Sequence, residues 1–439
     1  MKWMTLTRPD RYPRLLKVTW ARWQRQIVFL LGGVTVGASA VALALLADQV
    51  QAAFALLVGK WRYASLVVTP AGFVLAVFLT NRYFQNSQGS GIPQAIAARE
   101  LDDQAARGRL VSIRIAIGKI LLTLLGLLCG ASAGREGPTV QVGASIMFAI
   151  GRLSPRRQPG LILAGAAAGV AAAFNTPLAG IVFAIEEMSR AFEVRTSGLV
   201  IASVIAAGLT SLALVGNYAY FGTSPTMLRT GADWLAVPVC GVVGGLAGGL
   251  FSRIVVVVAR GLPGLLGAAI KQHRLPFAAA CGFAVALCGI ASGDTIYGTG
   301  YTHVKAALEG GVPLPWHFGL LKFAATTLST ISGIPGGIFS PSLAVGAGIG
   351  ANLAHLFAGA PVDAIILLGM VAYFAGVVQA PITAFVIVTE MTENHAMVIP
   401  LMAAALIAWL ASRLVCPEGI YHALAKGFLR QEPDTAAAH

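Results

Sequence analysis

The stretch Cys129–Ile146, with the sequence CGASAGREGPTVQVGASI, decides how the rest of the chain is interpreted. It places Arg135 and Glu136 on a glycine-rich bend between two apolar runs. Charged side chains between apolar segments are costly in a membrane and usually mark a functional site. Pro138 suits the first turn of a helix, and a helix N-terminus presents free N–H groups to an anion. The stretch therefore predicts a broken helix that begins beside a buried carboxylate.

The composition indicates an integral membrane protein. Of the 439 residues, 56% are hydrophobic and only 11% are charged, against about 25% charged residues in a soluble domain. Runs such as Ile27–Leu46 and Ile365–Thr389 are long enough to span a bilayer, which takes about 20 residues, whereas Thr139–Ile150 and Leu178–Ile185 are shorter. Helices that stop inside a membrane must line a cavity enclosed by protein or water. We therefore expect an all-α polytopic membrane protein with broken and tilted helices.

The charge distribution predicts the orientation of the chain. Residues 1–25 carry most of their charge as Lys and Arg, opposed only by Asp10, and the net charge of the chain is +13. By the positive-inside rule this basic N-terminal segment is cytoplasmic, and a topology signal explains it better than nucleic-acid binding. The five cysteines lack CxxC spacing, so we expect neither metal nor another cofactor. A single transmembrane domain is expected over 26–430, followed by a tail over 431–439.

Two halves of the chain repeat the same pattern. The second half shows the motif GGIFSPSLAVGAGI where the first shows GREGPTVQVGASI, and glycines and prolines match at an offset of 203: Gly134, Pro138 and Gly143 with Gly337, Pro341 and Gly346. At an offset of 204, Pro177 matches Pro381. Gly298–Gly300 is a candidate counterpart of Gly89–Gly91. Matching interruptions in two halves point to a transporter site at the repeat interface. We expect two repeats, about 26–220 and 235–430, in inverted orientation.

Five segments in order resemble the CLC family of chloride channels and chloride/proton antiporters, in its prokaryotic form without a cytoplasmic regulatory domain. They are GSGIP at 89–93, GREGP at 134–138, FNTPLAGIVFAIEEM at 174–188, GIFSP at 337–341 and Tyr421. The resemblance covers nearly the whole chain. Gln94 stands where an acidic residue is common and Ser340 where alanine is common, and neither is expected to alter a group that contacts the ion.

The resemblance implies exchange of chloride, or another monovalent anion such as nitrate, for protons. It implies a homodimer in the cell inner membrane, with one pathway in each subunit. The implied anion-binding groups are the hydroxyls of Ser90 and Tyr421 and backbone N–H groups at Ile338, Phe339, Arg135 and Gly137. Glu136 is implied as the gate and external proton site, because its carboxylate competes with chloride for the same donors. Glu187 matches the internal proton glutamate, which typical channel members lack.

Simpler interpretations stay open for each residue. Glu136 could form a structural ion pair with Arg135, and the hydroxyl of Ser90 could only cap its own helix. Glu187, next to Glu186, could be a helix-end charge near Arg190. Tyr421 and Phe339 could be an interfacial and a packing side chain, respectively.

Two alternative functions remain at this stage. The first is a passive chloride channel of the same fold. The second is a membrane-embedded serine hydrolase, because Gly130–Gly134 matches G-x-S-x-G around Ser132. That motif needs a strand–turn–helix setting and a nearby histidine, and His355 is remote in sequence, so the transporter interpretation is preferred.

Overall fold

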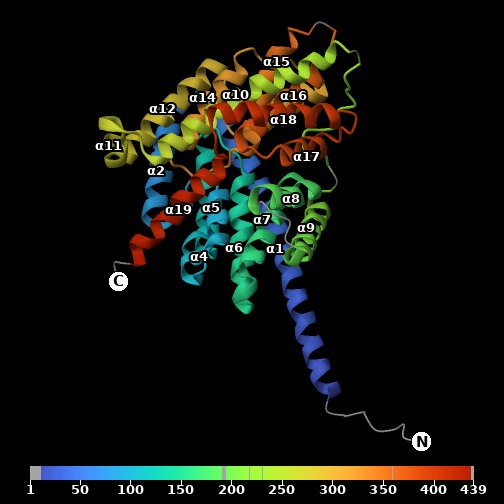
Figure 1. Cartoon of the computed structure of the whole chain (residues 1–439). Coiled ribbons are helices and arrows are strands. Elements are labelled where there is room, and N and C mark those ends of the chain that lie inside the picture. Colours follow the sequence, from blue (N-terminus) through green and yellow to red (C-terminus); the bar gives the residue numbers. More distant parts are fainter. Residues whose placement is uncertain (1–10, 190–193, 217, 230, 358, 437–439) are drawn as a thin grey trace, which may run out of the picture.

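A computed structural model describes residues 11–436 except 190–193, 217, 230 and 358. Its described residues form helices joined by loops (Figure 1). The first half contains α1 (Arg11–Lys60), α2 (Ser65–Tyr83), α3 (Ile92–Glu100), α4 (Gln104–Leu110), α5 (Ile113–Leu128), α6 (Glu136–Ile150), η1 (Gly151–Leu153), η2 (Pro155–Arg157), α7 (Gln158–Phe174), α8 (Pro177–Phe183), η3 (Ala184–Ser189) and α9 (Val194–Val215). The second half contains η4 (Asp233–Leu235), α10 (Ala236–Arg260), α11 (Gly264–Gln272), α12 (Arg274–Ser292), α13 (Tyr301–Gly310), α14 (Phe318–Ile331), α15 (Phe339–Ala354), α16 (Val362–Val378), α17 (Pro381–Thr392), α18 (Val398–Val415) and α19 (Ile420–Ala436).

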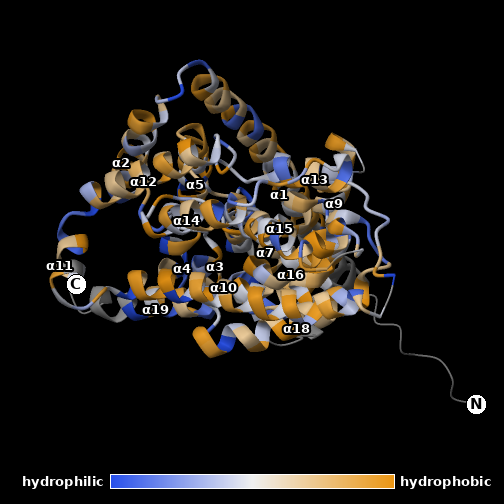
Figure 2. Ribbon diagram, turned by 90° about the horizontal axis from the view of Figure 1, so that it is seen from above, coloured by the Kyte–Doolittle hydropathy of each residue, from blue (hydrophilic) through white to orange (hydrophobic). Residues whose placement is uncertain are grey.

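The helices have the lengths and surfaces of a polytopic membrane protein. Seven helical segments within the described residues are long and apolar enough to cross a bilayer. Large hydrophobic side chains are exposed on the outside of the bundle, for example Ile399, Leu410 and Leu414 on α18, and Figure 2 shows the hydrophobic colouring along this helix. Exposed apolar side chains on outer helices are what a lipid environment requires. The all-α membrane fold expected from the sequence is confirmed.

The structure extends one expected element and divides another. The first apolar span begins at Gln26, after the basic segment as expected, but it belongs to a longer helix, because α1 runs without interruption from Arg11 to Lys60 and projects from the bundle (Figure 1); residues 1–10 lie outside the described residues. The predicted span Ile365–Thr389 is wrong. It is divided into α16 and α17, because Gln379 adopts a left-handed conformation with φ 58° and Pro381 starts a new helix. Proline has a fixed φ and no N–H, so it starts a helix more readily than it continues one.

Equivalent helix pairs pack in the same way in the two halves. Gly143 of α6 faces the carbonyl of Gly165 in α7 so closely that a Cβ atom would clash with it. Gly346 of α15 faces the carbonyl of Gly369 in α16, where a Cβ atom would lie 2.5 Å away. Small residues at such contacts let helix backbones approach closely. The repeat seen as a sequence offset is therefore also a repeat of helix packing.

Contacts between the two halves are reciprocal. The carboxylate of Glu186 accepts N–H bonds from Ile382 and Thr383 at the start of α17, at 3.0 and 2.6 Å. The carboxylate of Glu390 accepts N–H bonds from Leu178 and Ala179 at the start of α8, at 3.1 and 2.7 Å. Each half thus caps a broken helix of the other half. Contacts exchanged in this way are the mark of an approximate two-fold relation.

Two buried lysines also follow the repeat, at an offset of 203 that the sequence comparison did not detect. Lys119 donates to the carbonyl of Gly89 at 2.6 Å, and Lys322 donates to the carbonyl of Gly298 at 2.7 Å. Both side chains are fully buried. The backbone N–H of Gly89 bonds to Ile334 of the other half, and the N–H of Gly298 bonds in the same way to Ala131. These contacts support Gly298–Gly300 as the counterpart of Gly89–Gly91.

Candidate anion and proton sites

The bend that opens α6 is joined to the matching bend that opens α15. The N–H of Gly134 donates to the carbonyl of Gly337 at 2.7 Å, and the N–H of Gly337 donates back to the carbonyl of Gly134 at 2.7 Å. Both helices therefore begin at one place near the middle of the molecule. Each helix N-terminus is equivalent to roughly half a positive charge, so the pair favours a negative group between them.

A third helix start reaches the same place. Gly137 packs against Ser90, so that a Cβ atom on Gly137 would lie 2.9 Å from the Ser90 carbonyl and 3.1 Å from Cα of Gly337. Ser90 precedes α3, whose N-cap Gly91 has a φ of 95° that favours glycine. The N-terminal ends of α3, α6 and α15 thus meet at Gly137, where a side chain would separate them.

Three of the four residues predicted to bind the central anion line one cavity. Ser90, Ile338 and Tyr421 line a space of about 400 Å³ that also reaches α11 and α19. The Tyr421 side chain is fully buried, and its hydroxyl faces the Ser90 side chain but makes no hydrogen bond of normal length with a described residue. The Ser90 hydroxyl accepts the N–H of Ile92 at 3.2 Å, and its own proton can still be donated. This arrangement offers two hydroxyl groups to a ligand.

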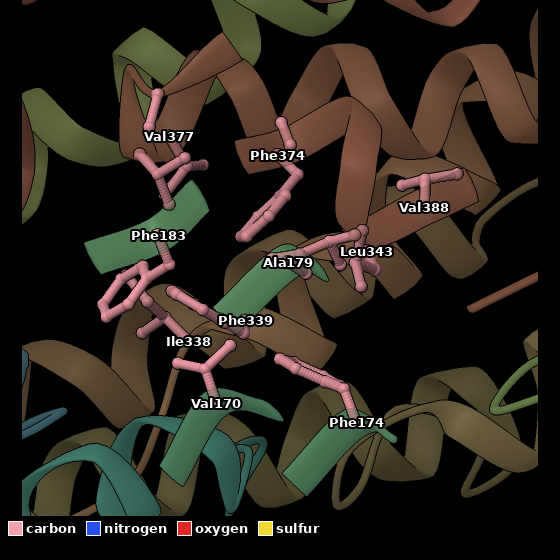
Figure 3. Close-up of a cluster of buried hydrophobic side chains, with 14 of the residues drawn as sticks. Val170, Phe174, Ala179, Phe183, Ile338, Phe339, Leu343, Phe374, Val377 and Val388 are labelled. Carbon is pink, nitrogen blue, oxygen red and sulfur yellow. The ribbon is translucent and has the colours of Figure 1, made fainter. Parts of the chain in front are cut away.

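Phe339 closes one side of this region with its ring. The ring stacks on Phe174 at 5.9 Å between centroids, meets Phe374 edge-on at 5.0 Å and lies 6.0 Å from the Tyr421 ring. Figure 3 shows Phe339 between Phe174, Phe183 and Phe374. The ring therefore packs in the core beside Tyr421, and the anion role predicted for Phe339 rests on its backbone N–H.

Glu136 is the fully buried first residue of α6. Its Oε1 accepts hydrogen bonds from the Ser340 hydroxyl at 2.6 Å and from the Tyr220 hydroxyl at 3.2 Å. Its Oε2 lies over Gly134, where a Cβ atom would clash with it. The carboxylate therefore occupies the region where the helix N-termini meet, and it is held there by hydroxyl groups.

Arg135 does not form the ion pair that was considered for Glu136. Its guanidinium bonds to the carboxylate of Asp48 at 2.6 Å and to the carbonyl of Ala44 at 2.5 Å, both on α1. The side chain therefore supports the bend from outside. Only the backbone of Arg135 faces the place where the helices begin.

Tyr220 and Ser340 are the site residues that sequence reasoning missed. Tyr220 lies in the connection between α9 and η4, a segment without a recognisable motif. The connection is fixed by a bond from the N–H of Phe221 to Met391 at 2.8 Å, and the ring of Tyr220 meets Phe174 edge-on at 5.7 Å. Ser340 was noticed only as a departure from the family pattern with no expected role. A serine at a position where alanine is common was the sequence feature that could have identified Ser340 as a site residue.

Glu187 lies at a second cavity, on the short π-helical segment η3. It is 4% exposed and lines a space of about 490 Å³ together with Glu186 and His422. Nε2 of His422 lies 2.8 Å from the Glu187 carbonyl oxygen and 3.7 Å from its carboxylate. Glu186 caps the start of α17, whereas the Glu187 carboxylate lies beside His422, so the two glutamates of this doublet have different surroundings. Arg190, the partner considered for a helix-end charge, lies outside the described residues.

The serine considered as a hydrolase nucleophile sits in a different environment. The hydroxyl of Ser132 is 2.9 Å from the hydroxyl of Thr326, and its N–H donates to Ser329 at 3.1 Å. His355 is exposed at the end of α15. Ser132 therefore has hydroxyl neighbours in place of a general base, which the nucleophilic mechanism requires.

Comparisons with known proteins agree with this geometry. Residues 72–413 match the family model described as voltage gated chloride channel. The H(+)/Cl(-) exchange transporter ClcA of Yersinia pseudotuberculosis serotype IB is 31% identical, over 91% of this chain and 87% of the relative. ClcA of Citrobacter koseri is 30% identical, over 85% of this chain and 82% of the relative.

Solved structures show the same fold at lower sequence identity. A CLC-type fluoride/proton antiporter matches with a TM-score of 0.79 at 23% identity, over 92% of this chain and 98% of that chain. A slow cyanobacterial Cl-/H+ antiporter matches with a TM-score of 0.73 at 23% identity, over 93% of this chain and 99% of that chain. With its family match, its relatives and its fold, the chain belongs to the CLC family of voltage-gated chloride channels and their exchanger relatives.

Proposed function

We propose that this protein is a secondary transporter that exchanges chloride for protons across a membrane. The observation that carries the proposal is the position of Glu136. Its carboxylate lies between the starts of α6 and α15, against Gly134 and Ser340, where an anion would be stabilised by N–H groups and helix dipoles. Relatives at 30–31% identity are named H(+)/Cl(-) exchange transporters. Nitrate and other monovalent anions could use the same neutral donors.

In this mechanism Glu136 is both the gate and the external proton site. While ionised, its carboxylate fills the outer anion position near the backbone N–H groups of Arg135 and Gly137. A proton removes the charge, the donors hold the neutral side chain less strongly, and chloride replaces it. The central anion would then be held by the hydroxyls of Ser90 and Tyr421 and by N–H groups at Ile338 and Phe339. Dipoles and neutral donors can bind an anion weakly enough for fast release.

The internal proton would pass through Glu187. This residue is buried between the transmembrane helices and borders the cavity with His422. Buried ionisable residues of membrane helices mark proton relays in transporters. A passive channel would need no such residue, and Glu187 therefore favours exchange.

Several features of organisation belong to the same proposal. The protein would be a homodimer in the cell inner membrane, surrounded by lipid, with the N-terminus in the cytoplasm. The transmembrane domain would comprise 26–430, with repeats over about 26–220 and 235–430. The exposed apolar side chains of α9 and α18, including Leu209 and Leu406, provide surface for lipid or a second copy.

The decisive experiment measures proton uptake driven by a chloride gradient. The purified protein is reconstituted into vesicles loaded with chloride, and external pH is recorded while the membrane voltage is clamped by a potassium ionophore. An exchanger moves protons against their gradient into the vesicles as chloride leaves. Chloride efflux without proton uptake would identify the passive channel, and the absence of both fluxes would reject ion transport by this route.

A further inference from the structure

We propose that Tyr220 and Ser340 are positioning residues that hold the ionised Glu136 carboxylate in the anion pathway and thereby set the proton concentration at which the gate opens. The proposal rests on the function proposed above and adds two residues to it. It also gives a role to Ser340, a side chain for which the family pattern offers none.

The two hydroxyls converge on one oxygen of the gate. Ser340 Oγ lies 2.6 Å and Tyr220 Oη 3.2 Å from Oε1 of Glu136, and the two hydroxyl oxygens are 3.3 Å apart. The three side chains are 0–1% exposed. Each hydroxyl could instead bond to the other, but an ionised carboxylate is the stronger acceptor, so both protons point to Glu136 when it is ionised.

Both donors belong to rigid parts of the molecule. Ser340 is the second residue of α15. The ring of Tyr220 lies between Phe174, Phe221 and Tyr301, with centroids 5.7, 5.1 and 4.7 Å away. Side chains fixed by packing keep their positions when the partner leaves. The donors therefore form a stationary latch from which the Glu136 side chain is released.

The latch distinguishes the two charge states of Glu136. Hydrogen bonds to an ionised carboxylate are roughly twice as strong as bonds between neutral groups. Both hydroxyls therefore stabilise the ionised, plugged gate more than the protonated gate. Removing one hydroxyl should let the gate leave at a lower proton concentration, which moves the pH dependence of transport toward alkaline pH.

The other charged and titratable groups near Glu136 do not explain such a shift. They are Arg135, Asp48, Tyr218, Tyr301 and Tyr421. Arginine and tyrosine keep one charge state between pH 4 and 8. Asp48 binds Arg135 at 2.6 Å, so Asp48→Asn leaves the arginine charge uncompensated, stabilises the ionised gate and should move the profile toward acidic pH, opposite to the shift expected for the latch variants.

The experiment records chloride flux in vesicles between pH 4 and 8 for Tyr220→Phe and Ser340→Ala, each of which removes one oxygen. Two matched controls are Tyr373→Phe and Ser342→Ala, since both hydroxyls are buried and have no partner among the described residues. We expect the pH of half-maximal flux to rise by about one unit in each test variant, equivalent to about 1.4 kcal/mol, and to stay unchanged in the two controls.

A double-variant comparison separates the latch from a general structural effect. When Glu136 is replaced by Gln, neither Tyr220→Phe nor Ser340→Ala should change the pH dependence further, because no ionisable gate is left to hold. Profiles of the single variants that coincide with those of the controls would overturn the proposal, as would a shift that persists in the Glu136→Gln background. If the unmodified protein moves chloride without protons, the exchange function itself fails. That result is distinct from coupled exchange with an unshifted profile.

Discussion

Replacing Glu136 by Gln should separate chloride movement from proton movement. The carboxylate now receives two charge-assisted hydrogen bonds, from Ser340 and Tyr220. Such bonds contribute about 1.5–3 kcal/mol each, against about 0.5–1.5 kcal/mol between neutral groups. The exchange to an uncharged amide thus weakens the plugged position by about 2–3 kcal/mol. Since 1.4 kcal/mol corresponds to a factor of ten, occupancy of that position should fall by roughly 30- to 150-fold.

Paired recordings of chloride and pH in the same vesicles test this prediction. Chloride efflux should persist in Glu136→Gln. Proton uptake driven by the chloride gradient should disappear, because an amide, unlike a carboxylate, does not take up and release a proton during transport. Asp102→Asn, which changes an exposed carboxylate on the surface, serves as the matched control and should retain coupling. Sustained chloride-driven proton uptake by Glu136→Gln would refute the gate role and require another external proton site.

Three further changes test the other parts of the site. Glu187→Gln should stop proton uptake while chloride still passes. Glu186→Gln, which alters a helix cap, should mainly lower stability. If Glu187→Gln retains as much proton uptake as Glu186→Gln, the internal proton site must lie elsewhere. Tyr421→Ala should weaken chloride binding by about tenfold, the equivalent of one hydrogen bond of about 1.4 kcal/mol, and unchanged calorimetric affinity would leave this residue a packing role. Lys322→Met should lower stability by about 2–5 kcal/mol, because two buried carbonyls, at Ile296 and Gly298, lose their donor; a thermal midpoint equal to that of the unmodified protein would contradict this.

Motifs around glycine and proline made much of the fold predictable. The breaks before Pro138 and Pro341 and the offset of 203 between them are local features, since proline and glycine restrict or extend the backbone at their own positions. Spacing also indicated that the two bends are equivalent. The structure adds that these bends bond directly to each other, through Gly134 and Gly337.

Periodicity and hydrophobic length were less reliable where a break falls within an apolar run. Ile365–Thr389 was interpreted as one span because its hydrophobicity is continuous. The structure breaks it at Gln379, whose left-handed conformation is stabilised by bonds of its side-chain amide to Cys416 and Ser412. Hydropathy measures the preference for lipid or protein interior, and it does not report on a backbone conformation fixed by a distant partner.

By itself the sequence determined the membrane class, the two repeats, and a buried carboxylate at the start of a helix, because each depends on composition or on neighbouring residues. Tertiary structure alone decided what holds that carboxylate. The partners of Glu136 are 84 and 204 residues away, at Tyr220 and Ser340. No local pattern brings them together. They meet because α15 and the connection after α9 pack beside the start of α6, and a buried carboxylate needs donors from whichever segments the packing places beside it.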